Sequence, residues 1–84
     1  MIEKGFYKVV YAARIITADT GFDCDETFWQ GHWELGELVY VVECKVHHAT
    51  NRRDLYAISF IREDGSFLKV SYCLDLFLED LKKV

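Results

Sequence analysis

The sequence predicts a small, mainly β domain in which five antiparallel strands curl into a barrel with a short C-terminal helical turn. Three observations support this fold class. Apolar and polar residues alternate with period two over most of the 84 residues. Turn residues separate these segments, and Asp64-Gly65 is the clearest hairpin signal. Because 51% of the residues are hydrophobic, a sheet this small has to curl to cover its own apolar face.

The N-terminal half is expected to form one strand, a loop and an irregular return leg. The strand covers residues 6–17, and Asp, Gly and Thr then interrupt the alternation in a loop at residues 18–27. The return leg at residues 28–36 is dense in aromatic residues and is interrupted by glycine. The residues expected on one face of the strand are Tyr7, Val9, Tyr11, Ala13 and Ile15.

The next part of the chain is expected to form a three-stranded antiparallel meander, with strands at residues 37–48, 55–62 and 67–74. In the first of these strands, Leu38, Tyr40, Val42, Cys44 and Val46 share one face. Its other face begins apolar and then becomes charged, as in a strand that starts buried on both sides and ends half exposed. The inward residues of the other two strands are Tyr56, Ile58, Phe60, Leu68, Val70 and Tyr72.

The C-terminal tail changes from strand to helical spacing. Leu74, Phe77, Leu78 and Leu81 recur at the spacing of one helical face. Asp75 near the start, with Lys82 and Lys83 near the end, suits the dipole of a short helix. Such a helix would cap one mouth of the curved sheet, and a single turn followed by a last short strand is the alternative.

Composition excludes several classes of protein. A single domain spanning residues 1–84 is expected, with enough apolar residues to exclude intrinsic disorder. The formal net charge of −4 disfavours nucleic-acid binding, which depends on basic side chains. We expect a cytoplasmic protein without membrane contact, because a secretory signal and long apolar runs are absent from the sequence. The odd number of widely spaced cysteines, 3, fits reduced thiols.

The order of these elements resembles the SH3-like barrel family. The segment "ELGELVYVVE" resembles the diverging turn and second strand of that family, and "IREDGSFLKVSY" resembles its distal hairpin. The resemblance covers most of the chain and implies the barrel fold. The aromatic motifs of members that bind proline-rich peptides are replaced here by "VVYAARI", "DLYAISF" and "SYCLDLF", so it does not imply proline recognition. The acidic loop residues Asp23, Asp25 and Glu26 match family positions that attract a basic ligand residue.

The segment "VECKVHHATNRRD" concentrates cysteine, histidine and arginine at the end of a predicted strand. Cys44 and His47 have the spacing of a zinc knuckle, but a second knuckle is lacking, and Cys24, His32 and Cys73 could join them only through the fold. A thiol nucleophile would need a base within hydrogen-bonding reach, and Cys44 lies mid-strand among valines. We therefore predict a core thiol, no metal, no cofactor and no enzymatic activity.

The same segment forms a local basic turn, whose residues are Lys45, His47, His48, Arg52 and Arg53. A solvated loop is the favoured interpretation of such a charge run. Contact with an acidic partner or a phosphate is the functional alternative.

The strongest candidate site is the acidic and aromatic segment "DCDETFWQGHW". Aromatic side chains beside carboxylates suit a protein interface, because Trp supplies a large contact area at small entropic cost. The alternative is that the two tryptophans close the core of the barrel. Calcium is disfavoured because the loop lacks the alternating pattern of a calcium-binding loop. The predicted partner-binding residues are Asp23, Asp25, Glu26, Phe28, Trp29 and Trp33.

These observations predict a non-enzymatic protein-binding module that docks on a partner protein through the acidic-aromatic loop. An inhibitor, immunity or phage-type adaptor role fits so small a chain, the partner could carry a basic patch, and a homodimer is compatible with the open sheet edges. The alternative function is a small-barrel nucleic-acid-binding protein. In that case stacking and charge would come from Arg52, Arg53, Tyr56 and Phe60.

Overall fold

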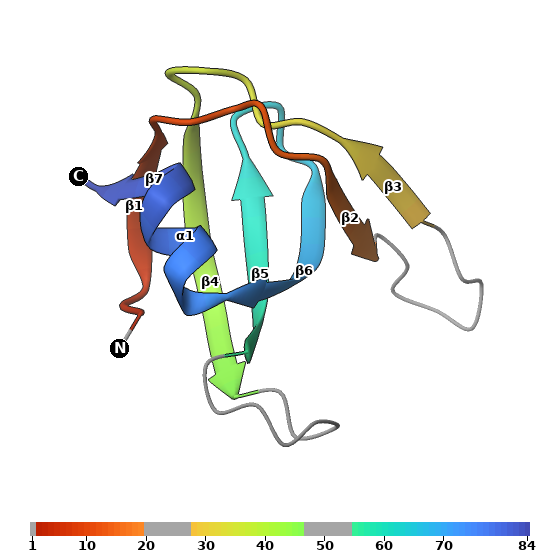
Figure 1. Cartoon of the computed structure of the whole chain (residues 1–84), viewed down its shortest axis with the longest axis vertical. Helices are drawn as coiled ribbons and strands as arrows, with labels where there is room; N and C mark the ends of the chain where they lie inside the picture. The colour runs from red at the N-terminus through yellow and green to blue at the C-terminus, as the bar shows by residue number, and fades with distance from the viewer. Residues whose placement is uncertain (1, 20–27, 47–54) are drawn as a thin grey trace.

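Among the residues that the structure describes, seven strands form one antiparallel sheet, and one short helix crosses one of its faces (Figure 1). The structure is a computed structural model, and it describes residues 2–19, 28–46 and 55–84. The sheet order is β3-β2-β6-β5-β4-β1-β7. The elements are β1 (Gly5–Val9), β2 (Ile16–Asp19), β3 (Phe28–Gly31), β4 (Leu38–Val46), β5 (Leu55–Arg62), β6 (Phe67–Cys73), α1 (Leu74–Asp80) and β7 (Leu81–Lys83).

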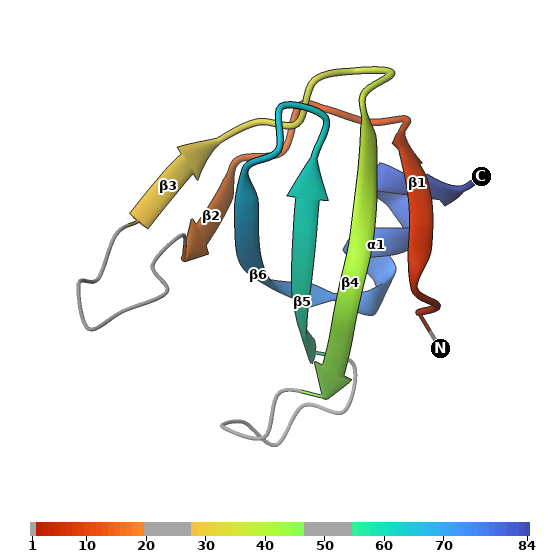
Figure 2. The ribbon, with the colours of Figure 1, turned by 180° about the vertical axis from the view of Figure 1, so that it is seen from behind.

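The prediction of a mainly β, antiparallel domain with a short C-terminal helix is confirmed, but the sheet has seven strands rather than five. The edge strands β3 and β7 do not pair with each other within the described residues, so the sheet is open rather than a closed barrel. The view from behind shows the face opposite α1, and none of the described elements covers that face (Figure 2). We call it the outer face.

The expected N-terminal strand divides into two because the chain leaves the sheet at Val10. The amides of Val10 and Tyr11 donate hydrogen bonds to the carbonyl oxygen of Asp80, at 2.8 and 3.3 Å, so this segment crosses to the end of α1. When the chain re-enters the sheet, the buried positions have changed parity. Tyr7 and Val9 are buried as expected, whereas Tyr11, Ala13 and Ile15 are exposed, and Ile16 and Ala18 take their place in the core.

A β-bulge reverses the expected inner and outer faces of β4. Val41 lies opposite Phe60, but Glu43 lies opposite Ser59, which leaves Val42 as the extra residue. Before the bulge, Val39 and Val41 point into the core and are fully buried, while Leu38 and Tyr40 point outward. After the bulge, Cys44 takes the inward position opposite Ile58. The prediction that one face joins Leu38, Tyr40, Val42, Cys44 and Val46 is therefore wrong.

The hairpin between β5 and β6 follows the prediction. Gly65 has a φ of 86°, which favours glycine, and the turn is closed by hydrogen bonds between Arg62 and Ser66 and between Gly65 and Arg62, both 2.9 Å. The expected inward residues of these two strands pack in or against the core. This hairpin supplies the central pair of strands on which the other elements assemble.

The tail contains both the helix and the last short strand that the sequence left as alternatives. Phe77 and Leu81 are buried as predicted, but Leu78 is exposed, and Asp80 occupies the buried position at the helix end. Lys82 and Lys83 belong to β7 and not to the last helical turn. Their predicted role opposite the helix dipole is therefore wrong.

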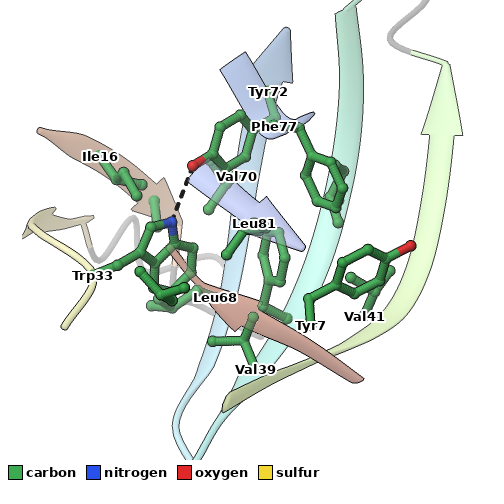
Figure 3. Close-up of a cluster of buried hydrophobic side chains, with 14 of the residues drawn as sticks. Tyr7, Ile16, Trp33, Val39, Val41, Leu68, Val70, Tyr72, Phe77 and Leu81 are labelled. Carbon is green, nitrogen blue, oxygen red and sulfur yellow. Dashed lines mark hydrogen bonds between the residues drawn. The ribbon is translucent and has the colours of Figure 1, made fainter. Parts of the chain in front are cut away.

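The core lies between α1 and the sheet and is rich in aromatic rings (Figure 3). The ring of Phe77 stacks on Phe60 and meets Tyr7 and Tyr72 edge to face, with centroids 6.3, 5.1 and 5.6 Å apart. Such ring pairs add to the stabilisation that comes from buried apolar area. Among the described residues, no helix has the length and apolar character that crossing a membrane requires.

Candidate functional site

The residues predicted to bind a partner fall into three groups. Asp23, Asp25 and Glu26 lie outside the described residues, so their prediction stays open. Phe28 begins β3. Trp29 is half-buried, and Trp33 is only 2% exposed.

Trp33 is part of the core and cannot contact a partner directly. Its ring meets Phe60 edge to face at 5.2 Å. Its Nε1 donates a 3.0 Å hydrogen bond to the hydroxyl oxygen of Tyr72, drawn as a dashed line in Figure 3. The prediction of Trp33 as a partner-binding residue is therefore wrong. The structure instead has the alternative arrangement, in which this indole closes the core. Burying so large a ring stabilises a small domain more than leaving it exposed to water.

Trp29 is held against the sheet by Arg62. The guanidinium carbon of Arg62 lies 5.2 Å from the centre of the Trp29 ring and 5.7 Å from that of Trp33. Nε and Nη2 of Arg62 each donate a 2.9 Å hydrogen bond to the carboxylate of Glu37, which fixes the guanidinium and raises the pKa of Arg62. This arrangement closes the end of the core next to the β5–β6 turn and uses one face of the Trp29 indole.

At the other end of the core, a chain of polar side chains joins elements that are distant in sequence. Tyr72 accepts from Trp33 and donates a 2.6 Å hydrogen bond to Oδ2 of Asp80, which is fully buried. Arg14 donates from Nε to both carboxylate oxygens of Asp80, at 3.0 and 3.2 Å. Burial, together with the neighbouring Asp80 carboxylate, raises the pKa of the Tyr72 hydroxyl.

This buried network is structural in character. Every buried side-chain nitrogen or oxygen of the described residues has a hydrogen-bond partner, and the network lies in the core. A general acid or base has to reach a substrate, and Asp80 is sealed from solvent. The network therefore fixes α1 and the crossing segment at residues 10–15 onto the sheet.

The described part of the chain gives no support to the cysteine and histidine residues as metal ligands or to Cys44 as a nucleophile. Cys44 is half-buried, and burial raises the pKa of its thiol, which keeps the thiol protonated and weakly nucleophilic. No group of three or more metal-ligating side chains occurs within the described parts of the chain. Cys24 and His47 lie outside those parts, and so do His48, Arg52 and Arg53, so the metal hypothesis and the basic turn remain predictions about residues not described.

The outer face of the sheet carries exposed apolar side chains on three neighbouring strands. Phe6, Tyr40 and Ile61 lie directly opposite one another on β1, β4 and β5, and they are 54%, 37% and 40% exposed. The rings of Phe6 and Tyr40 meet edge to face at 4.9 Å. Leu38, two residues before Tyr40 on the same side of β4, is 38% exposed. We call these four residues the outer apolar strip.

Lysines surround this strip. Lys8 lies opposite Leu38 on one side and Lys82 on the other, and both lysines are exposed. Lys45 forms a 2.9 Å ion pair with Glu43, and this pair, with smaller contributions from Lys4 and Lys69, lowers the pKa of Glu43. The outer lysines are Lys4, Lys8, Lys45, Lys69 and Lys82, which is every lysine of the chain except Lys83.

The charges of this acidic chain are therefore distributed unevenly. Asp75 and Glu79 lie on α1, at the opposite side of the sheet, while Glu43 and Glu63 lie on the strands that carry the strip or next to them. Glu43 is paired with Lys45, and Oε1 of Glu63 accepts a hydrogen bond from the amide of Leu38. The outer face therefore combines an apolar centre with a mainly basic border.

Alternation alone did not reveal the outer apolar strip. The alternation of residues 6–17 predicts no face for Phe6 and that of residues 37–48 predicts Tyr40 on the apolar face of its strand, because the bulge at Val42 leaves no mark in the pattern. The one signal in the sequence is that both faces of residues 38–42 are apolar, which exceeds what a one-sided core needs.

Comparisons with protein-family models, curated proteins and solved structures gave no match to this chain.

Proposed function

We propose that this protein is a non-enzymatic protein-binding module that docks on a partner protein through the outer face of its sheet. The observation that carries the proposal is the outer apolar strip, which crosses three neighbouring strands on a face that none of the described elements covers. Contiguous exposed apolar side chains with a polar border often mark a site of protein interaction.

The composition of the face also suits an interface. Protein interfaces have an apolar and aromatic centre with a polar border, and Tyr and Phe lose little conformational entropy when they are buried. Lys8, which lies opposite Leu38, and Lys82 beyond it supply such a polar border on one side of Phe6 and Tyr40. The proposed partner therefore offers an apolar surface flanked by carboxylates, and the charge of the border would speed association.

This proposal changes the docking surface that the sequence suggested but keeps the class of function. The acidic residues Asp23, Asp25 and Glu26, with Phe28 and the remaining face of Trp29, stay a predicted second contact for a basic patch on the partner. The inhibitor, immunity or adaptor roles, the cytoplasmic location, the homodimer and the SH3-like resemblance also remain predictions.

A capture experiment with matched variants tests the proposal. The double variant Phe6→Ser, Tyr40→Ser removes the two rings of the outer apolar strip, and Leu78→Ser removes one exposed apolar side chain from α1, away from the outer face. We expect the wild type and the Leu78→Ser variant to capture the same protein from a lysate, with binding that is then reproduced by the purified partner. The double variant should fold but lose that partner.

Two results would reject the outer face as the docking surface. One is a folded double variant that binds the purified partner as tightly as the wild type. The other is a loss of binding in the Leu78→Ser variant alone. Sedimentation of the wild type by itself shows whether the captured partner is a second copy of the chain.

The second candidate function is binding of single-stranded nucleic acid, which the pairing of aromatic side chains with lysines on the outer face favours. Of the residues predicted for this role, Phe60 is fully buried and Tyr56 packs against the core, while Arg52 and Arg53 lie outside the described residues and stay predictions. A salt titration with labelled oligothymidine separates the two functions. Contact with several phosphates requires affinity to fall steeply as salt rises.

A further inference from the structure

A pocket of about 470 Å³ opens between β2 and β6, beside α1, and no step of the proposed function uses it. It exists because these strands pair over only two residues. Ala18 lies opposite Val70 and Asp19 opposite Lys69, but both strands continue beyond this point without pairing to each other. The strands therefore diverge, and the space between them lies next to Leu76 of α1.

The floor and the border of this pocket differ in chemistry. Ile16, Ala18 and Val70 are buried and offer apolar side chains, to which Leu76 adds a fourth. The intervening residues of the same strands, Thr17, Lys69 and Ser71, are exposed and bring two hydroxyl groups and an ammonium group. A ligand that fits both parts has an apolar body and a polar end.

The charges of the lining residues decide the sign of that polar end. Arg14 and Lys69 line the pocket, and none of the described lining residues is a carboxylate. Arg14 is already paired with Asp80 at 3.0 Å and with Glu79 at 3.3 Å, so its charge is largely compensated. Lys69 is exposed, lies opposite Asp19 in the strand register, and forms no ion pair with a side chain that the structure describes.

We propose that the pocket binds a small amphipathic carboxylate, with its apolar body on the floor formed by Ile16, Val70 and Leu76 and its carboxylate at Lys69. The hydroxyl groups of Thr17 and Ser71 supply hydrogen bonds at the same border. The volume lies in the range of pockets that hold small organic ligands. This site is separate from the outer apolar strip, so its occupation does not require the partner protein.

The probe for this site is sodium decanoate below its micellar concentration, followed by amide chemical shifts of the ¹⁵N-labelled protein. Decanol and decyltrimethylammonium have the same chain without the negative charge. We expect decanoate to bind more tightly than decanol, and decyltrimethylammonium to bind most weakly. The shifted amides should be those of residues 16–18 and 69–72.

Two charge reversals sharpen the test. Lys69→Glu places a carboxylate at the border of the pocket, while Lys82→Glu changes the net charge equally on β7, at the far edge of the sheet. An exposed ion pair contributes modestly, but Lys69→Glu both removes the attraction and adds repulsion between two carboxylates. We therefore expect it to weaken decanoate binding about fivefold or more. Lys82→Glu should leave binding within about twofold of the wild type.

Each remaining outcome overturns the proposal. Shifts centred on Phe6 and Tyr40 would mean that decanoate binds the outer apolar strip instead. Equal affinity for decanoate and decyltrimethylammonium, or equal effects of the two charge reversals, would remove the role of Lys69. Absence of saturable shifts in the wild type would show that the pocket does not bind this class of ligand. Capture of the partner is measured separately with the Phe6→Ser, Tyr40→Ser variant, whose two residues do not line the pocket, so failure of one proposal is distinguishable from failure of the other.

Discussion

Replacing Tyr72 with Phe removes one oxygen atom from the buried network and leaves the ring in place. The hydroxyl group accepts from Nε1 of Trp33 at 3.0 Å and donates to Oδ2 of Asp80 at 2.6 Å. Tyr72→Phe therefore leaves the indole N–H without an acceptor in the core and deprives a fully buried carboxylate of a donor.

The expected loss of stability follows from these two hydrogen bonds. An orphaned buried donor costs about 1–3 kcal/mol, and a hydrogen bond to a charged group contributes about 1.5–3 kcal/mol. Because the two bonds share one hydroxyl group and are not additive, we expect Tyr72→Phe to lower the free energy of unfolding by about 2–4 kcal/mol. The cavity term is small, since only one oxygen atom is lost.

Urea unfolding at neutral pH measures this loss as a shift of the midpoint at constant m-value. The matched control is Tyr40→Phe, because the hydroxyl of Tyr40 lies on the outer face, and we expect that change to stay within about 0.5 kcal/mol of the wild type. A Tyr72→Phe variant whose unfolding midpoint equals that of the Tyr40→Phe variant would refute the buried network as a source of stability.

Three further predictions follow from the same contacts. Burial raises the pKa of the Tyr72 hydroxyl above the ordinary value of 10.0, so the unfolded chain releases this proton at a lower pH than the folded chain. The free energy of unfolding should therefore fall above about pH 10, by up to about 1.4 kcal/mol per pH unit. Tyr72→Phe should reduce that slope in alkaline urea titrations, and Tyr7, whose pKa is also raised, should keep part of it. Glu37→Gln removes the charge that holds Arg62 against the two indoles, so we expect the free energy of unfolding in urea to fall by about 1–3 kcal/mol. A decrease no larger than that of the exposed control Glu63→Gln would contradict this role of Glu37. Trp33→Ala should lower the free energy of unfolding by about 3–5 kcal/mol because its ring is buried, and Trp29→Ala should lower it less. In the Trp29→Ala variant the remaining indole is that of Trp33, and acrylamide should quench its fluorescence poorly. Strong quenching would place Trp33 at the surface.

The sequence determines the central strands well because their signals are local. Period-two alternation and Asp64-Gly65 predict the β5–β6 hairpin and its inward residues, from Ile58 to Tyr72, without knowledge of other elements. The tail likewise changes to helical spacing at Leu74, where α1 begins. In these segments local preference and tertiary packing agree.

The features that failed depend on contacts between distant residues. The chain leaves β1 at Val10 because the carbonyl of Asp80 offers a hydrogen-bond acceptor, and the alternation of residues 6–17 contains no sign of this. The bulge at Val42 has no glycine or proline to mark it, yet it decides which face of β4 is buried. A single inserted residue reverses the face of every residue that follows.

The candidate site that the structure indicates differs from the predicted one for the same reason. The acceptor of the Trp33 indole, Tyr72, lies 39 residues along the chain, so composition alone could not distinguish a binding indole from a core indole. The outer apolar strip becomes a row only when β1, β4 and β5 stand in register. Neither arrangement is encoded in a contiguous motif.

Hydroxyl-radical footprinting of the purified complex is the most direct measurement of the docking surface. Oxidation of Phe6, Leu38, Tyr40 and Ile61 should be high in the free protein and should fall when the captured partner is bound, while Leu78 on α1 should oxidise equally in both states. If these four side chains stay fully reactive in the complex while Leu78 becomes protected, the partner binds the helix side and the outer face is not the interface.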